Sequence, residues 1–273
     1  MIGDPIAHSL SPVLHNAAFA ALELDWAYLA FEVPAESAAD AIAGMRAFGI
    51  DGLSVTMPHK SAVAAAVDEL TAVAEALGSV NTVVRHGGTL VGHSTDGAGL
   101  VAALRADEGF DPAGARCVVL GAGGAARAVV HALAEAGSAK VAVAARVRGK
   151  AEVAATLAGH RGQVVDVLEQ EVREADLIIN ATPVGMGNAG IPFEVSSAWL
   201  GAGQVVVDLV YDPPVTPLLL LARERGAVAV NGLGMLIHQA AAAFRLWTGE
   251  DPPLEVMSAA AASALAHRRD QAD

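Results

Sequence analysis

The stretch Leu120-Gly121-Ala122-Gly123-Gly124-Ala125-Ala126 follows an apolar run and opens a segment rich in helix-forming residues. In that context the pattern Gly-x-Gly-x-x-Ala is typical of a loop that binds the diphosphate of a dinucleotide. Gly121 permits a tight turn, Gly123 lets the backbone approach a phosphate, and the small Ala126 lets helix and strand pack closely. A glycine-rich turn without a ligand is the alternative, and the pattern of the surrounding chain disfavours it.

Around this loop, short apolar runs alternate with helical stretches, as in a parallel sheet covered by helices on both faces. The predicted strands are residues 117–120, 141–145, 163–166, 177–181, 205–210 and 227–230. The predicted helices between them are residues 125–136, 149–158, 168–173 and 217–225. Six strands on this plan predict an α/β fold with a Rossmann-like, doubly wound nucleotide domain.

The residues after the second of these strands indicate which dinucleotide binds. An NAD enzyme places an acidic residue there, where it accepts hydrogen bonds from the ribose 2′-hydroxyl. This chain instead has the cations Arg146, Arg148 and Lys150, and no acid in the segment 143–150. A guanidinium binds phosphate with two parallel hydrogen bonds, so Arg146 favours the 2′-phosphate of NADP. The alternative is a solvated basic loop.

Composition excludes several classes of protein. The chain has 273 residues, enough for about two domains, and a net charge of -13, which disfavours nucleic acid and anionic membranes as partners. Hydrophobic residues make up 53%, but polar residues or proline interrupt every apolar run, so no membrane span is predicted. One cysteine, Cys117, and the lack of a signal-peptide pattern favour a cytoplasmic protein. The histidines show no metal-ligand spacing, and no metal is expected.

A smaller α/β unit precedes the nucleotide domain. Its predicted strands are residues 27–33, 52–56, 81–84 and 89–92, and its predicted helices are residues 12–22, 38–48, 60–67 and 70–77. After residue 230 only the helical stretches 234–247 and 253–266 follow. Their apolar faces could pack on either unit.

Polar residues gather where strands and helices of this unit begin or end. A helix that begins with Ser11 as N-cap and Pro12 as its first residue explains why these two residues stand together. It does not explain the serine at position 9. In an extended segment Ser9 and Ser11 point the same way, and together they could hold a carboxylate. Lys60 stands at a predicted helix start, where the helix dipole disfavours a cation, and this hints at a function.

Seven ordered motifs together resemble the shikimate dehydrogenase family. They are Ser9 to Asn16 (SxSPxxHN), Val55 to Lys60 (VTxPxK), Asn81-Thr82, Thr95-Asp96-Gly97, Gly121 to Arg127 (GAGGAAR), Asn180 to Met186 (NATPxGM) and Gly232 to Ala241 (GLxMLxxQAA). The resemblance implies a discontinuous catalytic domain of residues 1–97 and 232–273, an NADP domain of residues 98–231, and a substrate cleft between them.

The resemblance also implies roles for individual residues. Lys60 and Asp96 are expected to be the catalytic pair. The positions expected to contact substrate are Ser9, Ser11, Thr56, Asn81, Tyr211 and Gln239. Those expected to contact NADP are Gly121, Ala122, Gly123, Gly124, Ala125, Arg127, Arg146, Thr182, Gly232 and Met235. Without the resemblance, Gln239 would pass as a solvated helix residue and Met235 as core filling.

The implied reaction is the NADPH-dependent, reversible reduction of 3-dehydroshikimate to shikimate, in the shikimate pathway of aromatic amino acid biosynthesis. Protonated Lys60 would donate to the forming alkoxide, while Asp96 holds the ammonium group. One alternative is a quinate/shikimate dehydrogenase with broader substrate or NAD use, and another is a catalytically silent NADP-binding sensor. A structural ion pair is the alternative role for Lys60 and Asp96. The oligomeric state, monomer or homodimer, stays open.

Overall fold

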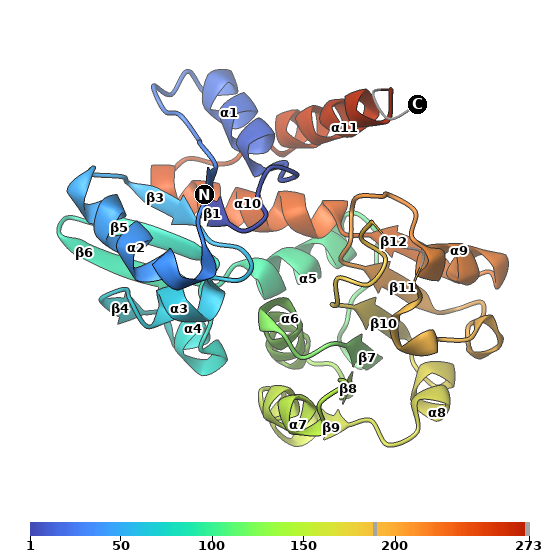
Figure 1. Ribbon diagram of the computed structural model, residues 1–273. Helices are drawn as coiled ribbons and strands as arrows, with labels where there is room; N and C mark the ends of the chain where they lie inside the picture. The colour runs from blue at the N-terminus through green and yellow to red at the C-terminus, as the bar shows by residue number, and fades with distance from the viewer. Residues whose placement is uncertain (188–189, 271–273) are drawn as a thin grey trace. The chain divides into compact units, whose positions relative to one another are not determined.

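The structure, a computed structural model, describes residues 1–187 and 190–270 (Figure 1). The chain forms two compact units. The first combines Met1–Thr95 with the C-terminal segment Leu236–Asp273, and the second is the continuous segment Asp96–Met235.

A six-stranded parallel sheet with the order β12-β11-β10-β7-β8-β9 forms the centre of the second unit. Its strands are Arg116–Leu120 (β7), Lys140–Ala144 (β8), Gly162–Val164 (β9), Leu177–Asn180 (β10), Val205–Asp208 (β11) and Val228–Asn231 (β12). The chain runs from β7 outward to β9, then crosses over and runs from β10 outward to β12 on the other side. This strand order is that of a Rossmann-like fold, so the predicted fold class and the six strands of this unit are confirmed.

Helices cover both faces of this sheet, as Figure 1 shows, because its strands are apolar on both sides. In β7, Cys117 and Val119 pack with residues of α5, α6 and α7, whereas Val118 and Leu120 pack with residues of α8 and α9. The helices are Asp96–Ala106 (α5), Gly124–Glu135 (α6), Arg148–Thr156 (α7), Leu168–Arg173 (α8) and Pro217–Glu224 (α9). The sequence pattern predicts no helix over the residues of α5.

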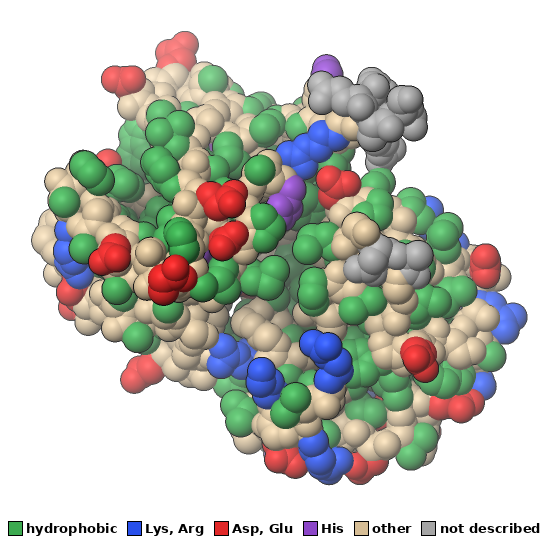
Figure 2. Space-filling model, viewed as in Figure 1, with side chains coloured by type: hydrophobic (Ala, Val, Ile, Leu, Met, Phe, Trp, Pro, Cys, Tyr) green, Lys and Arg blue, Asp and Glu red, His purple; other side chains and the backbone are tan. Residues whose placement is uncertain are grey.

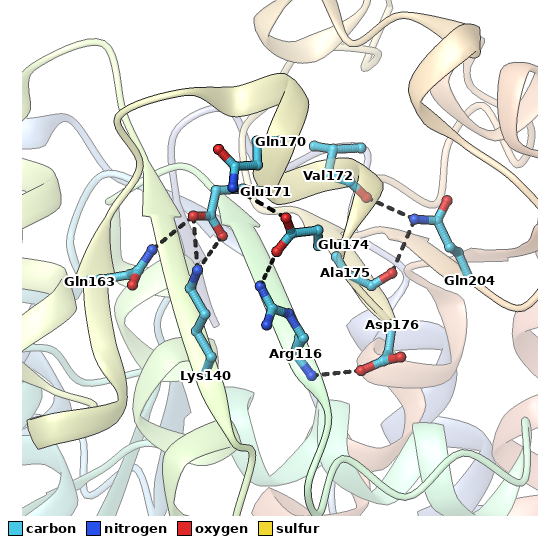
Figure 3. Close-up of polar contacts among 10 residues, drawn as sticks. All are labelled: Arg116, Lys140, Gln163, Gln170, Glu171, Val172, Glu174, Ala175, Asp176 and Gln204. Carbon is cyan, nitrogen blue, oxygen red and sulfur yellow. Dashed lines mark hydrogen bonds and ion pairs between the residues drawn. The ribbon is translucent and has the colours of Figure 1, made fainter.

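Ion pairs hold α8 against the amino ends of the strands (Figure 3). Lys140 Nζ, at the start of β8, lies 2.6 Å from Glu171 Oε2, and Gln163 Nε2 donates to Glu171 Oε1 at 2.9 Å. Arg116, at the start of β7, pairs with Glu174 at the end of the helix. The short helix thus stays attached although it has a single fully buried residue, Val172.

Gln204, the buried residue before β11, fastens the other side of α8 (Figure 3). Its Nε2 donates to the carbonyl oxygens of Val172 at 2.7 Å and Ala175 at 3.0 Å. Its Oε1 accepts from Gly201 N at 2.9 Å. Gln204 therefore adds a side-chain donor to backbone carbonyls at the end of α8, where hydrogen-bond partners within a helix run out.

The first unit has a four-stranded sheet with the order β3-β5-β6-β4 and a parallel pair, β1 and β2. Its strands are Ile2–Gly3 (β1), Phe31–Glu32 (β2), Gly52–Ser54 (β3), Glu69–Leu70 (β4), Thr82–His86 (β5) and Thr89–His93 (β6). A bridge between Ile2 and Val55 joins the pair to the larger sheet. The helices are Ser11–Ala21 (α1), Ala35–Ser37 (η1, a 3-10 turn), Ala38–Ala47 (α2), Lys60–Ala64 (α3) and Ala72–Leu77 (α4).

The strand predicted over residues 27–33 is wrong in its first half. Tyr28 is not paired in a strand: its backbone N and O instead bind the side-chain amide of Asn16, at 2.8 and 2.9 Å. Only Phe31–Glu32 forms a strand. Leu70, the first residue of the helix predicted over 70–77, lies in β4 instead. The prediction missed this strand because two residues are too few to show a periodic pattern.

The C-terminal helices are Leu233–Thr248 (α10) and Leu254–Asp270 (α11), and α11 packs against α1. Trp247 of α10 donates from Nε1 to Val83 O at 3.0 Å. A Cβ on Gly52 would lie 2.4 Å from this indole ring, so only glycine fits there. Within residues 1–187 and 190–270, no helix is long and apolar enough to cross a membrane.

Candidate functional site

The glycine-rich loop lies between the carboxyl end of β7 and the start of α6. Gly121 has φ +123°, and a Cβ there would lie 2.9 Å from Ala181 O, so the position requires glycine. Gly123 is exposed, and a Cβ there would meet no atom within 4 Å. An open approach to the first N–H groups of a twelve-residue helix is the arrangement that binds phosphate.

The other residues of this loop lie where the sequence predicts them. Gly124 is the first residue of α6, and Ala126 is fully buried against the sheet. Ala122, Ala125 and Arg127 are half-buried. The loop thus presents backbone groups and one cation, with its small side chains against the core.

Gly121 also lies at the topological switch point of the sheet. β7 and β10 are neighbours, and the chain leaves them in opposite directions. Thr182 follows β10, and its methyl carbon Cγ2 would lie 3.2 Å from a Cβ on Gly121. In open α/β sheets, ligands bind outside the carboxyl ends of the strands at such a point.

Asn180, the last residue of β10, organises the turn that carries Thr182. Its Oδ1 accepts from Thr182 N at 3.0 Å and from Thr182 Oγ1 at 2.7 Å. Its Nδ2 donates to Val184 O at 3.1 Å and to Asp208 Oδ1 at 2.9 Å. These four bonds match the donors and acceptors that one side-chain amide offers.

Asp208 is a fully buried carboxylate at the end of β11. Besides Asn180, it accepts hydrogen bonds from Val210 N at 3.1 Å and Thr216 Oγ1 at 2.6 Å. Burial raises the pKa of Asp208, and these three hydrogen bonds oppose the rise. Sequence reasoning missed Asp208, because its only sequence signal is a polar residue at the end of an apolar strand.

Three basic residues follow β8, and they differ in their partners. Arg148 is paired with Glu152 at 3.2 Å and with Asp166 at 3.1 Å. Arg146 is exposed and, among residues 1–187 and 190–270, forms no ion pair. Figure 2 shows Lys and Arg side chains gathered over the region of α6 and α7. Arg146 thus remains available for an anion beside the loop, as NADP binding requires.

Residues near the end of the second unit pack closely. A Cβ on Gly232 would lie 2.1 Å from Leu209 O, so this glycine is needed for packing. Met235 belongs to the hydrophobic core of this unit. Tyr211 is half-buried just after β11. A direct role of these three residues toward a ligand stays a prediction.

In the first unit, the predicted cap of α1 is wrong. Ser11 is the first helical residue, and Leu10, at the N-cap position, provides no side-chain cap. Ser9 Oγ instead accepts from Ser11 N at 3.2 Å, so Ser9 performs the capping role. Burial raises the pKa of Tyr28, and hydrogen bonds with the hydroxyl groups of Ser54 and Ser11 oppose this. The buried Ser11 therefore belongs to a hydroxyl cluster with Tyr28 and Ser54.

The loop that carries Thr56 and Lys60 lies beside the N-terminal turn. Asp4 N donates to Met57 O at 3.0 Å, and a Cβ on Gly3 would lie 2.4 Å from the Thr56 methyl group. Lys60 is half-buried at the start of α3, and its carbonyl accepts from Val80 N at 3.0 Å. The loop is thereby placed next to the strand that begins after Asn81.

Asn81 connects three parts of the first unit. Its Nδ2 donates to Thr95 Oγ1 at 2.8 Å and to Gln239 Oε1 at 3.3 Å. Its Oδ1 accepts from Thr95 N at 2.8 Å. Gln239, on α10, also donates to Leu236 O at 2.8 Å. The fold thus brings together two predicted substrate residues that lie 158 positions apart.

Asp96 directly follows Thr95 and is the first residue of α5. It is buried, with 7% of its surface exposed, and a carboxylate is favoured at a helix N-terminus. Asp96 and Lys60 belong to different units. In the described part of the chain, no group of three His, Cys, Asp or Glu side chains could hold a metal ion.

Comparison with known proteins places these features in a family. Residues 1–83 match the family "Shikimate dehydrogenase substrate binding domain", residues 104–185 "Shikimate / quinate 5-dehydrogenase", and residues 232–262 "Shikimate 5'-dehydrogenase C-terminal domain". The chain is 47% identical over 266 residues to the shikimate dehydrogenase (NADP(+)) of Methanopyrus kandleri, which covers 94% of this chain and 92% of that protein.

Two solved structures show the same fold. The shikimate 5-dehydrogenase of Thermus thermophilus, in complex with NADP(H) and shikimate, has a TM-score of 0.89 and 38% identity, covering 97% of this chain and 98% of that one. The 5-ketofructose reductase of a Gluconobacter strain has a TM-score of 0.85 and 32% identity, covering 96% of each chain. The fold is therefore shared by a shikimate 5-dehydrogenase and a 5-ketofructose reductase.

Proposed function

The chain belongs to the shikimate dehydrogenase family, and from this membership we propose that it reduces 3-dehydroshikimate to shikimate with NADPH, reversibly. The enzyme is an NADP-dependent oxidoreductase of the shikimate pathway, which leads to the aromatic amino acids. The single observation in this chain that supports NADP most directly is Arg146, an exposed cation after the end of β8, where NAD enzymes carry an acid.

The residues of the second unit fit the cofactor. The first turn of α6 and the open face of Gly123 would receive the diphosphate, and Arg127 adds a positive charge in that turn. Arg146 would bind the 2′-phosphate. Thr182, Gly232 and Met235 would border the nicotinamide end. When bound, NADPH supplies the hydride to the substrate ketone.

The protein's own contribution is to orient the ketone and to supply one proton. We propose that the Lys60 ammonium donates this proton to the carbonyl oxygen as it becomes a hydroxyl. The Asp96 carboxylate would hold the ammonium group and accept a hydrogen bond from the substrate hydroxyl. A general acid of this kind contributes about 10²–10⁴-fold to the rate.

Hydroxyl and amide groups of the first unit, with one residue of the second, would bind the substrate. Ser9 and Ser11, at the start of α1, would bind its carboxylate. Asn81 and Gln239 already contact each other, and their 3.3 Å bond is longer than the two 2.8 Å bonds between Asn81 and Thr95, so a substrate hydroxyl could replace it. Thr56 and Tyr211 complete the proposed set.

The similarity to a 5-ketofructose reductase makes substrate choice the property to measure first. Initial rates are measured for shikimate and quinate, each with NADP+ and with NAD+. Rates for 5-ketofructose are measured with NADPH and with NADH. The proposal expects kcat/KM to be highest for shikimate with NADP+. A preference for quinate with NAD+, or for 5-ketofructose with NADPH, would assign a different reductase, and no turnover with measurable NADP+ binding would indicate a silent sensor.

We also propose that the protein works in the cytoplasm as a monomer or homodimer. Its single cysteine is buried, and burial raises the pKa of the Cys117 thiol to about 11, which keeps it unreactive. Light scattering during size-exclusion chromatography distinguishes the two oligomeric states.

A further inference from the structure

The turn after β10 is attached to the core by a chain of buried side chains that the proposed reaction does not use. Asp208 Oδ1 accepts a 2.9 Å hydrogen bond from Asn180 Nδ2. Asn180 Oδ1 in turn accepts from the backbone N–H and from the side-chain hydroxyl of Thr182. Asp208 and Asn180 are fully buried. The chain of contacts therefore runs from the end of β11, through the end of β10, to the turn at the switch point.

We propose that Asp208 is a positioning residue for NADP binding: through Asn180 it holds the turn of residues 181–185 in one conformation beside the glycine-rich loop. This inference rests on the proposed function, because it assumes that the dinucleotide binds at residues 121–127.

Packing of the turn supports this role. On one side, Ala181 O lies 2.9 Å from where a Cβ of Gly121 would stand, so the turn touches the glycine-rich loop. On the other side, a Cβ on Gly185, which has φ +103°, would lie 3.3 Å from Thr216 Cβ. Thr216 is the residue that donates to Asp208 Oδ2. A shift of the turn in either direction would disturb one of these contacts.

The hydrogen-bond pattern explains why a carboxylate stands at position 208. Asn180, Val210 and Thr216 all present donors to it, and a carboxylate offers only acceptors. Asparagine could keep one oxygen toward Asn180, with its amide group toward Thr216. Leucine would remove every acceptor and leave the Asn180 amide free to turn away from Thr182.

Gln204 supplies a matched control. It stands at the other end of the same strand, about 13 Å from Asp208 along β11, and it is buried and hydrogen-bonded. Its amide nitrogen donates to Val172 in α8 and to Ala175 just after it (Figure 3), and its oxygen accepts from Gly201, so none of its partners lies in the turn. Gln204→Leu should therefore lower stability without affecting the cofactor.

The experiment compares wild type, Asp208→Leu, Asp208→Asn and Gln204→Leu well below their melting temperatures. Calorimetry gives the Kd for NADP+, kinetics give the KM for shikimate at saturating NADP+, and a thermal melt gives Tm. We expect Asp208→Leu to raise the Kd for NADP+ about tenfold and to leave the KM for shikimate within twofold. Asp208→Asn should stay within threefold of wild type, and Gln204→Leu should lower Tm alone.

An unchanged Kd in Asp208→Leu overturns the inference, and so does an equal rise in Gln204→Leu, because the effect would then follow stability alone. If Asp208→Leu does not fold, Asp208→Ser replaces it. The serine hydroxyl ends one bond short of the carboxylate oxygens and so should not reach Asn180, and the same tenfold rise in the Kd for NADP+ is required. Asn180→Ala should match its effect, and the double variant should add nothing. If wild type itself does not bind NADP+, the proposed function fails instead.

Discussion

Asn81 and Thr95 are joined by two hydrogen bonds, from Asn81 Nδ2 to Thr95 Oγ1 and from Thr95 N to Asn81 Oδ1, both 2.8 Å long. Both residues are buried; Asn81 is itself a predicted substrate residue, and Thr95 directly precedes the predicted catalytic residue Asp96. The pair fixes the chain immediately before Asp96, so the structural and the functional roles of Asn81 can be separated by substitution.

Asn81→Ala should lower the free energy of unfolding by about 2 kcal/mol, because it leaves the buried N–H of Thr95 without its acceptor. It should also raise the KM for shikimate, since the amide is lost. Asn81→Asp keeps the acceptor for Thr95 N and serves as the control in urea unfolding. Equal loss of stability in both variants would contradict the assigned bond.

Lys60→Ala should reduce kcat by about 10²–10⁴-fold because the proton donor is lost, while the Kd for NADP+ stays the same because Lys60 is not among the proposed NADP contacts. Lys60→Arg keeps the positive charge, but a guanidinium does not give up its proton, so this variant should be nearly as slow. Stopped-flow rates and cofactor titration measure the two quantities. Normal turnover in Lys60→Ala would leave Lys60 with a purely structural role.

Arg146→Gln should raise the KM for NADP+ about tenfold to a hundredfold, because a charge-assisted contact to the 2′-phosphate disappears. The KM for NAD+, which lacks this phosphate, should not change. Arg148→Gln removes a charge two residues away that is already paired with Glu152 and Asp166, and it should leave both values within twofold. A loss confined to Arg148→Gln would reassign the 2′-phosphate site.

His15 should make stability depend on pH. It is buried between aromatic rings, stacked on Tyr28 with centroids 4.4 Å apart, and burial lowers the pKa of its side chain from 6.5 to about 3. The unfolded chain binds a proton at His15 near pH 6.5, and the folded chain does not. The contribution of His15 to the free energy of unfolding is therefore fully present above pH 6.5 and is lost as the pH falls toward 3.

Urea unfolding of wild type and His15→Phe between pH 7.5 and 4.5 tests this. The difference between their free energies of unfolding should change by about 1.4 kcal/mol per pH unit below pH 6, because Phe keeps the ring and cannot bind the proton. Parallel curves for the two proteins would mean that His15 is not the responsible group.

Gln204→Leu should lower the free energy of unfolding by about 2–3 kcal/mol, since two backbone carbonyl groups lose a side-chain hydrogen bond and Gly201 N loses its acceptor. Gln170→Leu, at an exposed position of α8 where the side chain contacts Glu174, should cost less than about 0.5 kcal/mol. Chemical unfolding followed by circular dichroism compares them, and equal stability of the two variants would contradict the buried-cap role of Gln204.

Much of the second unit could be predicted from sequence, because its signals are local. An apolar run, glycines at fixed spacing and a helical stretch lie within about twenty residues of one another, and their physical meaning does not depend on the rest of the chain. The absence of an acid near Arg146 is a signal of the same kind. The short strands at Ile2–Gly3 and Glu69–Leu70 were missed because they exist only through pairing with distant segments.

The sequence by itself determined the Rossmann-like domain, its glycine-rich loop and the position of Arg146, which is proposed to bind NADP, since each follows from the order of neighbouring residues. Only the tertiary structure decided that Ser9 rather than Ser11 caps α1, that Arg148 is paired with Glu152 and Asp166, and that Asp208 holds Asn180. The physical reason is that a hydrogen bond or ion pair depends on distance in space. Asn81 and Gln239, or Asn180 and Asp208, come within bonding distance only when the sheets and helices between them have formed.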